Sequence, residues 1–271
     1  MQKITKNVYA ETEFNGCNVG FVVTSKGIVM IDTPMLPSEA VEWRDKLAKY
    51  GKVRYLINTE PHQDHFSGNY FFKCPVIAHE GTRATILRLG QKSAVEYKES
   101  LKQTDPASVP LMKKFAFVAP TITFSERMTL YFGDHTFQLI NLPGHTAFQV
   151  AVFIPEEKVV FTSDDVFYQV PTWLHEALPY QWLESLQKLQ EMDARILVPG
   201  HGNVCDKSYL SEMKATIQSW INVISGAINR GMNEEEIQKN IGNLLDTRLT
   251  GAGYDQNLLS MNITRLYDVL K

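Results

Sequence analysis

A short apolar run that follows a predicted helix is the feature of this 271-residue sequence that most restricts its fold. Residues 37–50 are expected to form a helix that opens with Pro37 and is ended by Gly51. Residues 53–58 are apolar between polar flanks, as in a strand that is buried in the interior of a sheet. A helix that leads into a buried strand indicates a βαβ unit, so the sequence predicts an α/β fold.

The rest of the chain repeats this alternation of strands and helices. A second short strand is expected at residues 75–79, a helix at 81–103 and a proline-rich connection at 104–120. A β-rich block then covers residues 121–162, and a further buried strand is expected at 196–198. Helices are predicted at residues 181–192, 209–230, 233–240 and 256–270. We expect one domain over residues 1–271, built from two αβ halves at roughly 1–120 and 121–271 whose sheets pack together.

A dense group of polar side chains follows the first buried strand directly. Residues 59–65 read Thr-Glu-Pro-His-Gln-Asp-His and hold four groups that can bind a metal, namely Glu60, His62, Asp64 and His65. Open α/β sheets place ligand sites at the carboxyl ends of their strands, where the strand holds the loop rigid. A single histidine has ordinary explanations, but this density predicts a metal site with room for two neighbouring ions.

Three later motifs strengthen this prediction. His145 lies in Leu-Pro-Gly-His-Thr at 142–146, Asp164 in Phe-Thr-Ser-Asp-Asp at 161–165, and His201 in Val-Pro-Gly-His-Gly at 198–202. Each is expected just past an apolar strand, so all of them could converge on one edge of the fold. The three histidines outside these motifs are His79, His135 and His175.

In this order the motifs resemble those of the metallo-β-lactamase superfamily. The family pattern is His-x-His-x-Asp-His, a Pro-Gly-His turn, a strand-end Asp and a final Gly-His, and the resemblance covers residues 18–202. It implies a four-layer αβ/βα sandwich with the metals in a cleft between the sheet edges. It further implies that His62 and His145 hold one metal, that Asp64, His65 and His201 hold the second, and that Asp164 bridges the two.

The sequence departs from the family pattern at Glu60, which stands where the first signature histidine is expected. Two divalent ions are expected, zinc first, but a carboxylate in place of an imidazole favours iron or manganese relative to zinc. Alternatively, Glu60 points away and leaves the first site weak or empty. Ser163 replaces the usual Gly before Asp164, which we expect to matter little. Asp165 is expected either to orient a ligand histidine or to be a surface or helix-capping residue.

The resemblance also implies a reaction. A metal-bound hydroxide would cleave an ester, lactone, thioester or amide bond in a small molecule, and a β-lactam is one such substrate. Asp64 would orient the nucleophile and pass its proton to the leaving group, although its position is equally compatible with simple metal ligation. Two alternatives remain open: a mononuclear-iron oxidoreductase such as a persulfide dioxygenase, and a non-catalytic binding protein whose site has decayed.

Two segments are candidates for the walls of the site. Residues 166–175 are unusually aromatic for a loop, and Phe167, Tyr168 and Trp173 could either line the site or anchor the loop to the body. Residues 83–119 could form a helical lid. Leu87, Tyr97 and Met112 would line such a lid, or they are ordinary core residues at helical spacing.

Composition and charge narrow the range of partners. The net charge is −3 and Lys113 and Lys114 are the nearest approach to a basic block, so nucleic acid is not expected. Three widely spaced cysteines, Cys17, Cys74 and Cys205, indicate reduced thiols. The sequence shows no signal peptide and no run of about 20 apolar residues, so we expect a cytoplasmic protein without a membrane segment. The helices at 209–230 and 256–270 could support a homodimer or could complete the outer layers.

Overall fold

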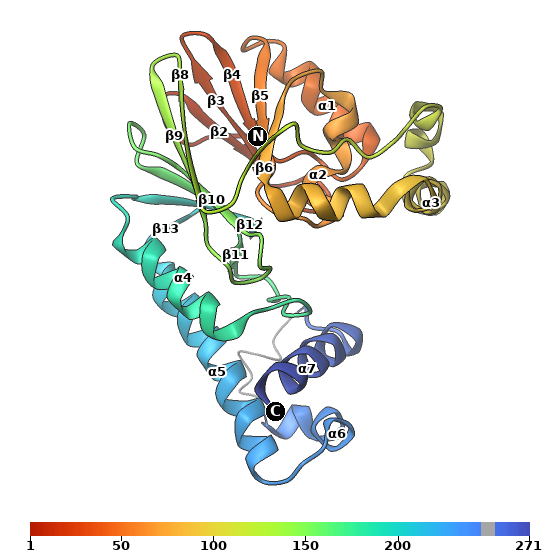
Figure 1. Ribbon diagram of the computed structural model, residues 1–271, viewed down its shortest axis with the longest axis vertical. Coiled ribbons are helices and arrows are strands. Elements are labelled where there is room, and N and C mark those ends of the chain that lie inside the picture. Colours follow the sequence, from red (N-terminus) through yellow and green to blue (C-terminus); the bar gives the residue numbers. More distant parts are fainter. Residues whose placement is uncertain (245–252) are drawn as a thin grey trace.

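The computed structural model describes residues 1–244 and 253–271 and contains two β-sheets (Figure 1). The first sheet has seven strands in sequence order, antiparallel from β1 to β4 and parallel from β4 to β7. Its strands are β1 (Gln2–Lys3), β2 (Val8–Glu11), β3 (Val19–Thr24), β4 (Gly27–Ile31), β5 (Val53–Ile57), β6 (Val76–His79) and β7 (Ile122–Phe124).

The second sheet has six strands in the order β13-β12-β11-β10-β9-β8. All of its pairings are antiparallel except the parallel pair β11 and β12. Its strands are β8 (Arg127–Phe132), β9 (His135–Asn141), β10 (Val150–Ile154), β11 (Val159–Tyr168), β12 (Ile196–Gly202) and β13 (Cys205–Asp206). The β-rich block that was expected from residue 121 is therefore divided, because β7 pairs with β6 in the first sheet.

Helices cover the outer faces of both sheets, α1 and α3 on the side of the first sheet and α4 and α5 on the side of the second (Figure 1). The α-helices are α1 (Pro37–Leu47), α2 (Gln63–Phe66), α3 (Glu80–Thr104), α4 (Pro179–Glu191), α5 (Tyr209–Asn229), α6 (Glu234–Leu244) and α7 (Gln256–Leu270). Short 3-10 helices follow at η1 (Ser67–Phe71) and η2 (Pro106–Met112), the latter inside the expected connection.

The two sheets pack face to face through a cluster of buried aliphatic and aromatic side chains. Val29, Ile31 and Ile57 from the first sheet meet Phe161 and Val198 from the second. A separate cluster joins the first sheet to α1, and the largest joins the second sheet to the helices that follow it. Each sheet thus buries both of its faces, which confirms the predicted four-layer αβ/βα sandwich.

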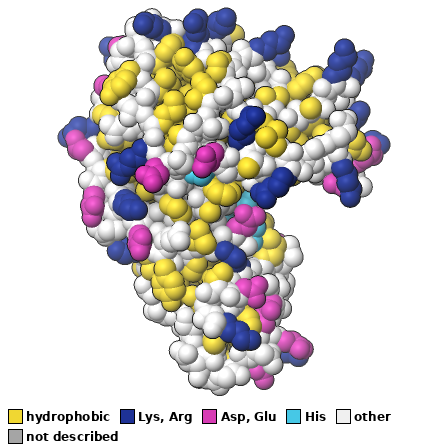
Figure 2. Space-filling view, in the orientation of Figure 1, with side chains coloured by type: hydrophobic (Ala, Val, Ile, Leu, Met, Phe, Trp, Pro, Cys, Tyr) yellow, Lys and Arg dark blue, Asp and Glu magenta, His cyan; other side chains and the backbone are white. Residues whose placement is uncertain are grey.

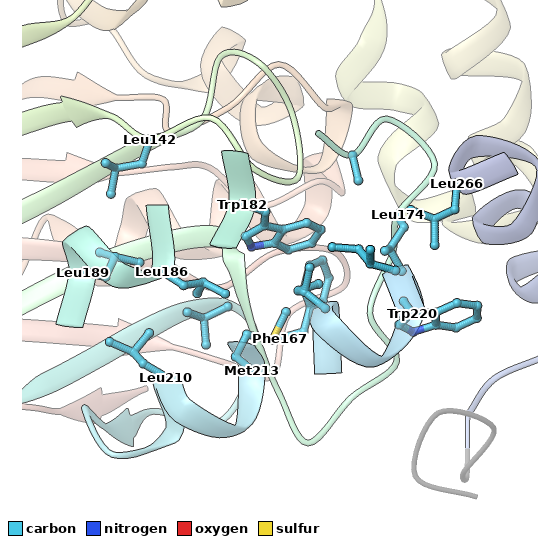
Figure 3. Close-up of a cluster of buried hydrophobic side chains, with 14 of the residues drawn as sticks. Leu142, Phe167, Leu174, Trp182, Leu186, Leu189, Leu210, Met213, Trp220 and Leu266 are labelled. Carbon is cyan, nitrogen blue, oxygen red and sulfur yellow. The ribbon is translucent and has the colours of Figure 1, made fainter. Parts of the chain in front are cut away.

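The largest cluster also fixes the segment between β11 and α4, which we call the 169–178 loop. Leu174 of this loop lies in the same cluster as Leu266 of α7, close to the buried Trp182 and Trp220 (Figure 3). The apolar faces of α5 and α7 are buried in this cluster, as expected of helices that complete the outer layers. The C-terminal helices therefore hold the loop in place.

Two strands are longer than the sequence predicted, and this changes the setting of two candidate ligands. The strand that closes the expected β-rich block at residue 162 runs from Val159 to Tyr168, and the one expected at 196–198 runs from Ile196 to Gly202. Parallel pairing between them continues to Tyr168 and Gly202 across two irregularities near Ser163. Asp164 and His201 thus lie within strands rather than past them. A strand ends where its pairing with the neighbouring strand ends, and the local pattern of apolar residues does not indicate that pairing.

Two of the three residues that could line a lid over the site are core residues. Tyr97 and Met112 are buried with Leu36 and Phe115 in a small cluster of their own, whereas Leu87 is exposed. Their helical spacing therefore reflects ordinary core packing. Among the described residues, none of the helices has both the length and the apolarity needed to cross a bilayer.

Candidate metal centre

The first group of candidate ligands forms around the segment that follows β5. Glu60 is fully buried, and its Oε1 lies 2.7 Å from Nδ1 of His62. The same His62 nitrogen lies 3.3 Å from Nε2 of His145, which follows β9. Asp164 completes the group, with Oδ2 at 3.6 Å from the same atom of His145. The Glu60 carboxylate thus points into the cluster, contrary to the alternative in which it turns away.

The second group lies beside the first and contains Asp64, His65 and His201. Oδ2 of Asp64 is 3.3 Å from Nε2 of His201 and 3.7 Å from Nε2 of His65. Asp164 stands between the two groups, since its Oδ1 lies 3.2 Å from His65 and its Oδ2 lies 3.4 Å from His201. The structure therefore brings all seven predicted ligands together, with Asp164 between the two groups.

Local backbone geometry aims Asp164 into the site. Ser163 has a left-handed φ of 51°, a conformation that favours glycine, so the exchange of Gly for Ser matters more than we expected. Oγ of Ser163 lies within hydrogen-bond distance of Oγ1 of Thr59, at 2.6 Å, and this contact helps to hold the strand irregularity. On β12, a Cβ on Gly200 would lie 1.8 Å from Oδ1 of Asp164, so the neighbouring strand must carry glycine there.

Several residues around the centre fix the orientation of the candidate ligands. Oδ2 of Asp32 lies 3.0 Å from Nδ1 of His65, and the carbonyl oxygen of Trp173 lies 2.8 Å from Nδ1 of His145. Such contacts set the ring orientation and tautomer of a ligand histidine. Asp165 is fully buried and accepts a hydrogen bond from the backbone N–H of His145 at 3.4 Å. It is therefore neither a surface residue nor a helix cap.

Several buried nitrogen and oxygen atoms of the candidate ligands make no hydrogen bond to the described residues, as expected where a cation binds. Within the described part of the chain, Nε2 of His65, Nε2 of His62 and Oδ1 of Asp164 are buried and make no hydrogen bond. Burying such atoms unpaired costs free energy, and a bound cation would satisfy them. Histidine and carboxylate together are a donor set typical of zinc and of other divalent transition metals.

The pKa values of two histidines in the cluster indicate a strongly negative electrostatic potential at the site. Burial opposes the charged imidazolium, but the Glu60 carboxylate outweighs it and raises the pKa of His62 to about 11. In the second group Asp164 does the same for His201, whose pKa rises to about 10. Although burial acts in the opposite direction, His65 and His201 lower the pKa of Asp64 to about 2. The negative potential that stabilises protons here would also attract a divalent cation.

His175, like Asp32, lies near the site although the sequence motifs did not predict it. Its ring centroid lies 4.9 Å from that of His62 and 5.3 Å from that of His145. Burial, together with the two neighbouring imidazoles, lowers the pKa of His175 to about 4, so the ring is neutral at pH 7. His175 does not follow a strand end in the sequence. It reaches the site because the 169–178 loop folds back toward the ligand groups.

The aromatic segment at 166–175 combines both of its predicted roles. Phe167 is buried and stacks on the ring of His201 at 5.3 Å, whereas Tyr168 packs against Tyr209. Trp173 is 40% exposed and packs edge-on against His175. Phe167 and Tyr168 thus anchor the segment, and Trp173 is the one of the three predicted wall residues that faces solvent beside the site.

An open hollow of about 290 Å³ adjoins the first group of candidate ligands. In Figure 2, histidine side chains are visible where the part that contains the sheets meets the C-terminal helices, with basic and acidic side chains around them. The hollow is lined by Thr146, Ala147, Phe148, His175, Glu176, Leu178 and Arg265. The lining includes His175, which lies beside His62, but none of the seven candidate ligands.

A further group, Cys17 with Asp32 and His65, lies behind the second group of ligands. Burial raises the pKa of the Cys17 thiol, which keeps it protonated, and Sγ donates to the backbone oxygen of Asp64 at 3.2 Å. Cys17 therefore supports the main chain of the site through this hydrogen bond. All three cysteines are free, in agreement with the reduced thiols that the sequence predicts.

Comparison with known proteins agrees with this geometry. The family model of the metallo-β-lactamase superfamily matches residues 12–201. A metallo-β-lactamase type 2 from Elizabethkingia meningoseptica is 26% identical over 229 residues, which cover 77% of this chain and 80% of that protein. A hydroxyacylglutathione hydrolase from Bartonella quintana (strain Toulouse) is 35% identical over 74 residues, which cover 27% of this chain and 29% of that protein.

Two solved structures share the fold. A metallo-β-lactamase from Pontibacter korlensis superimposes with a TM-score of 0.63 at 23% identity, covering 80% of this chain and 97% of that one. The sec-alkylsulfatase Pisa1 from a Pseudomonas species superimposes with a TM-score of 0.76 at 15% identity. That match covers 98% of this chain and 49% of the other.

The family match spans more than half of the chain and includes every candidate ligand, so this protein belongs to the metallo-β-lactamase superfamily. Proteins of this family bind divalent metals, usually zinc. The chain is accordingly a metal-dependent hydrolase with the metallo-β-lactamase fold.

Proposed function

We propose that this hydrolase uses two divalent metal ions, zinc in the first instance, to cleave an ester, lactone, thioester or amide bond in a small molecule. The observation that carries the proposal is the pair of ligand groups that share Asp164. One group would consist of Glu60, His62 and His145, and the other of Asp64, His65 and His201. Two groups joined by a carboxylate favour a dinuclear centre over a single iron.

Two bound cations would lower the pKa of a shared water toward neutrality and polarise the bond to be cleaved. The protein would supply the proton transfer. The Asp64 carboxylate is 21% exposed at the edge of the site and lies 3.3 Å from His201, so it can reach both the water and a substrate. In this proposal Asp64 takes a proton from the attacking water and hands it to the leaving group.

The hollow beside the first group supports a substrate of modest size. Its volume of about 290 Å³ is near the lower end of the range for small-molecule sites. Its lining combines apolar Phe148 and Leu178 with the polar groups of Glu176 and Arg265. A metallo-β-lactamase and a hydroxyacylglutathione hydrolase among the relatives are consistent with attack on an acyl group.

The test is metal content together with a substrate screen. Protein purified without chelator or an affinity-metal column is analysed by elemental mass spectrometry and assayed on esters, lactones, thioesters and β-lactams. We expect about two transition-metal ions per chain and an activity that a chelator abolishes and added metal restores. One iron per chain with oxygen consumption on a persulfide would replace this proposal with the oxidoreductase. Protein that neither holds nor takes up metal would contradict both.

A further inference from the structure

We propose that His175 is an additional ligand of the first metal site and supplies the third imidazole that the exchange of histidine for Glu60 removed. This inference rests on the proposed function, because it adds a ligand to the same centre. No motif predicts it, since His175 lies ten residues after Asp165, the last residue of the motif that contains Asp164, in the 169–178 loop.

The three imidazole rings have the spacing that one ion would require. For a tetrahedral ion with metal–nitrogen bonds of about 2.0–2.1 Å, ligand nitrogens lie about 3.3 Å apart and the ring centres about 5 Å apart. Nδ1 of His62 and Nε2 of His145 are separated by 3.3 Å. The ring centroids lie 5.0 Å apart for His62 and His145, 4.9 Å for His62 and His175, and 5.3 Å for His145 and His175.

The ligand nitrogens themselves also converge. One nitrogen from each of His62, His145 and His175 falls in a group whose members all lie within 4.8 Å of one another. Nδ1 of His175 is buried and has no hydrogen-bond partner in the described part of the chain. A buried ring nitrogen that is left unpaired costs free energy, and coordination would satisfy it.

The loop that carries His175 is held rigidly enough to present a ligand. Asn262 of α7 is fully buried, donates from Nδ2 to the carbonyl oxygen of Thr172 at 2.9 Å and accepts from the N–H of Leu174 at 2.7 Å. Arg265, one turn further along, donates to the carbonyl oxygens of Ala177 and Glu176 at 2.9 and 3.3 Å. These four bonds bracket His175 on both sides.

The same clamp connects α7 to a second ligand. The carbonyl oxygen of Trp173 lies between the two residues that Asn262 binds, and it contacts Nδ1 of His145 at 2.8 Å. Leu174 is buried against the cluster that includes Leu266 (Figure 3). The C-terminal helix therefore positions both an expected imidazole, His145, and the additional one, His175.

The experiment compares the cobalt(II)-loaded wild-type protein with His175→Gln. His135→Gln is the matched control, because it makes the same exchange at a histidine that belongs to none of the ligand groups. The first measurement is the strength of binding of each of two cobalt ions in competition with a chelator. The second is the number of imidazole N–H signals that the bound cobalt shifts in the proton NMR spectrum. Circular dichroism verifies that each variant is folded.

We expect five shifted imidazole signals in the wild type, from His62, His65, His145, His175 and His201. His175→Gln should show four and should bind one cobalt ion at least tenfold more weakly, while the other ion and the control variant change less than threefold. Four signals in the wild type and unchanged affinity in His175→Gln would overturn this proposal but leave the dinuclear hydrolase intact. A wild-type protein that binds no cobalt would overturn both.

Discussion

Oδ2 of Asp32 lies 3.0 Å from Nδ1 of His65, and both side chains are buried at the back of the second ligand group. Asp32 in turn accepts hydrogen bonds from the backbone N–H and the hydroxyl of Thr59 at 2.8 and 2.5 Å. This arrangement leaves Nε2 of His65 free to face Asp164. A carboxylate in this place fixes the ligand ring and raises its basicity.

Asp32→Asn should therefore weaken metal binding at the second site. We expect a loss of about 10–100-fold in affinity for one of the two ions, because the amide cannot polarise the imidazole as a carboxylate does. Chelator competition measures the change. Asp45→Asn, an exposed aspartate on α1, is the control and should bind both ions as the wild type does. Equal affinity in Asp32→Asn would show that His65 needs no support from this side.

Glu60→Gln should remove metal from the first site selectively. The carboxylate contributes both a ligand atom and a negative charge in a fully buried position, and a neutral amide provides a weaker donor there. Elemental analysis should find about one ion per chain in place of two. Glu42→Gln, on the exposed side of α1, should leave the stoichiometry unchanged. Two retained ions and full turnover in Glu60→Gln would contradict the assignment of Glu60 as a ligand.

Asp64→Asn separates proton transfer from metal ligation. If the carboxylate carries a proton to the leaving group, turnover should fall by about 10²–10⁴-fold while both ions remain bound. Steady-state kinetics and metal analysis on the same preparation measure the two effects. A loss of the second ion in proportion to the loss of turnover would mean that Asp64 acts only as a ligand.

Gly200→Ala should disturb the centre although it replaces none of the candidate ligands. The new Cβ would lie 1.8 Å from Oδ1 of Asp164 and 2.7 Å from the backbone carbon of Ser163, so the strand pair must shift. We expect a loss of about 1–3 kcal/mol in the free energy of unfolding, together with weaker metal binding. Gly226→Ala in α5 is the matched control, because its nearest neighbour is the end of the Arg230 side chain at 3.5 Å. Denaturant unfolding should find that variant as stable as the wild type or more stable.

His135 and Glu157 form a pair far from the centre whose stabilising effect depends on pH. Their side chains lie 3.0 Å apart; although burial opposes both charges, hydrogen bonds with Glu157 and Asp134 raise the pKa of His135. Hydrogen bonds from Thr5, His135 and Asn7 lower the pKa of Glu157 in the same way.

A raised histidine pKa stabilises the fold fully below the unfolded value of about 6.5 and loses that effect as pH rises through the folded value. A lowered glutamate pKa stabilises above about 4.3 and loses its effect as pH falls. His135→Gln should therefore lower Tm more at pH 5.5 than at pH 9. An equal loss of Tm at the two pH values would mean that the contact does not depend on charge.

The strand-end motifs explain why so much of the candidate site could be predicted from the sequence. Glu60, His62, Asp64 and His65 fall within six consecutive residues that begin three residues after β5, and a buried strand directs such a segment to one edge of its sheet. The alternation of helix and apolar strand likewise predicts the layers, and α7 occupies the residues expected. These features depend on the spacing and periodicity of residues within a local segment, so the sequence of that segment is enough to predict them.

Features that depend on pairing between distant segments became apparent only in the folded structure. The lengths of β11 and β12 follow from hydrogen bonds between residues such as Phe167 and His201, and the left-handed turn at Ser163 follows from that register. His175 reaches the site because α7, more than eighty residues later, binds the 169–178 loop through Asn262. Local sequence determines where a strand begins and which residues follow it, but contacts between remote segments determine which side chains meet.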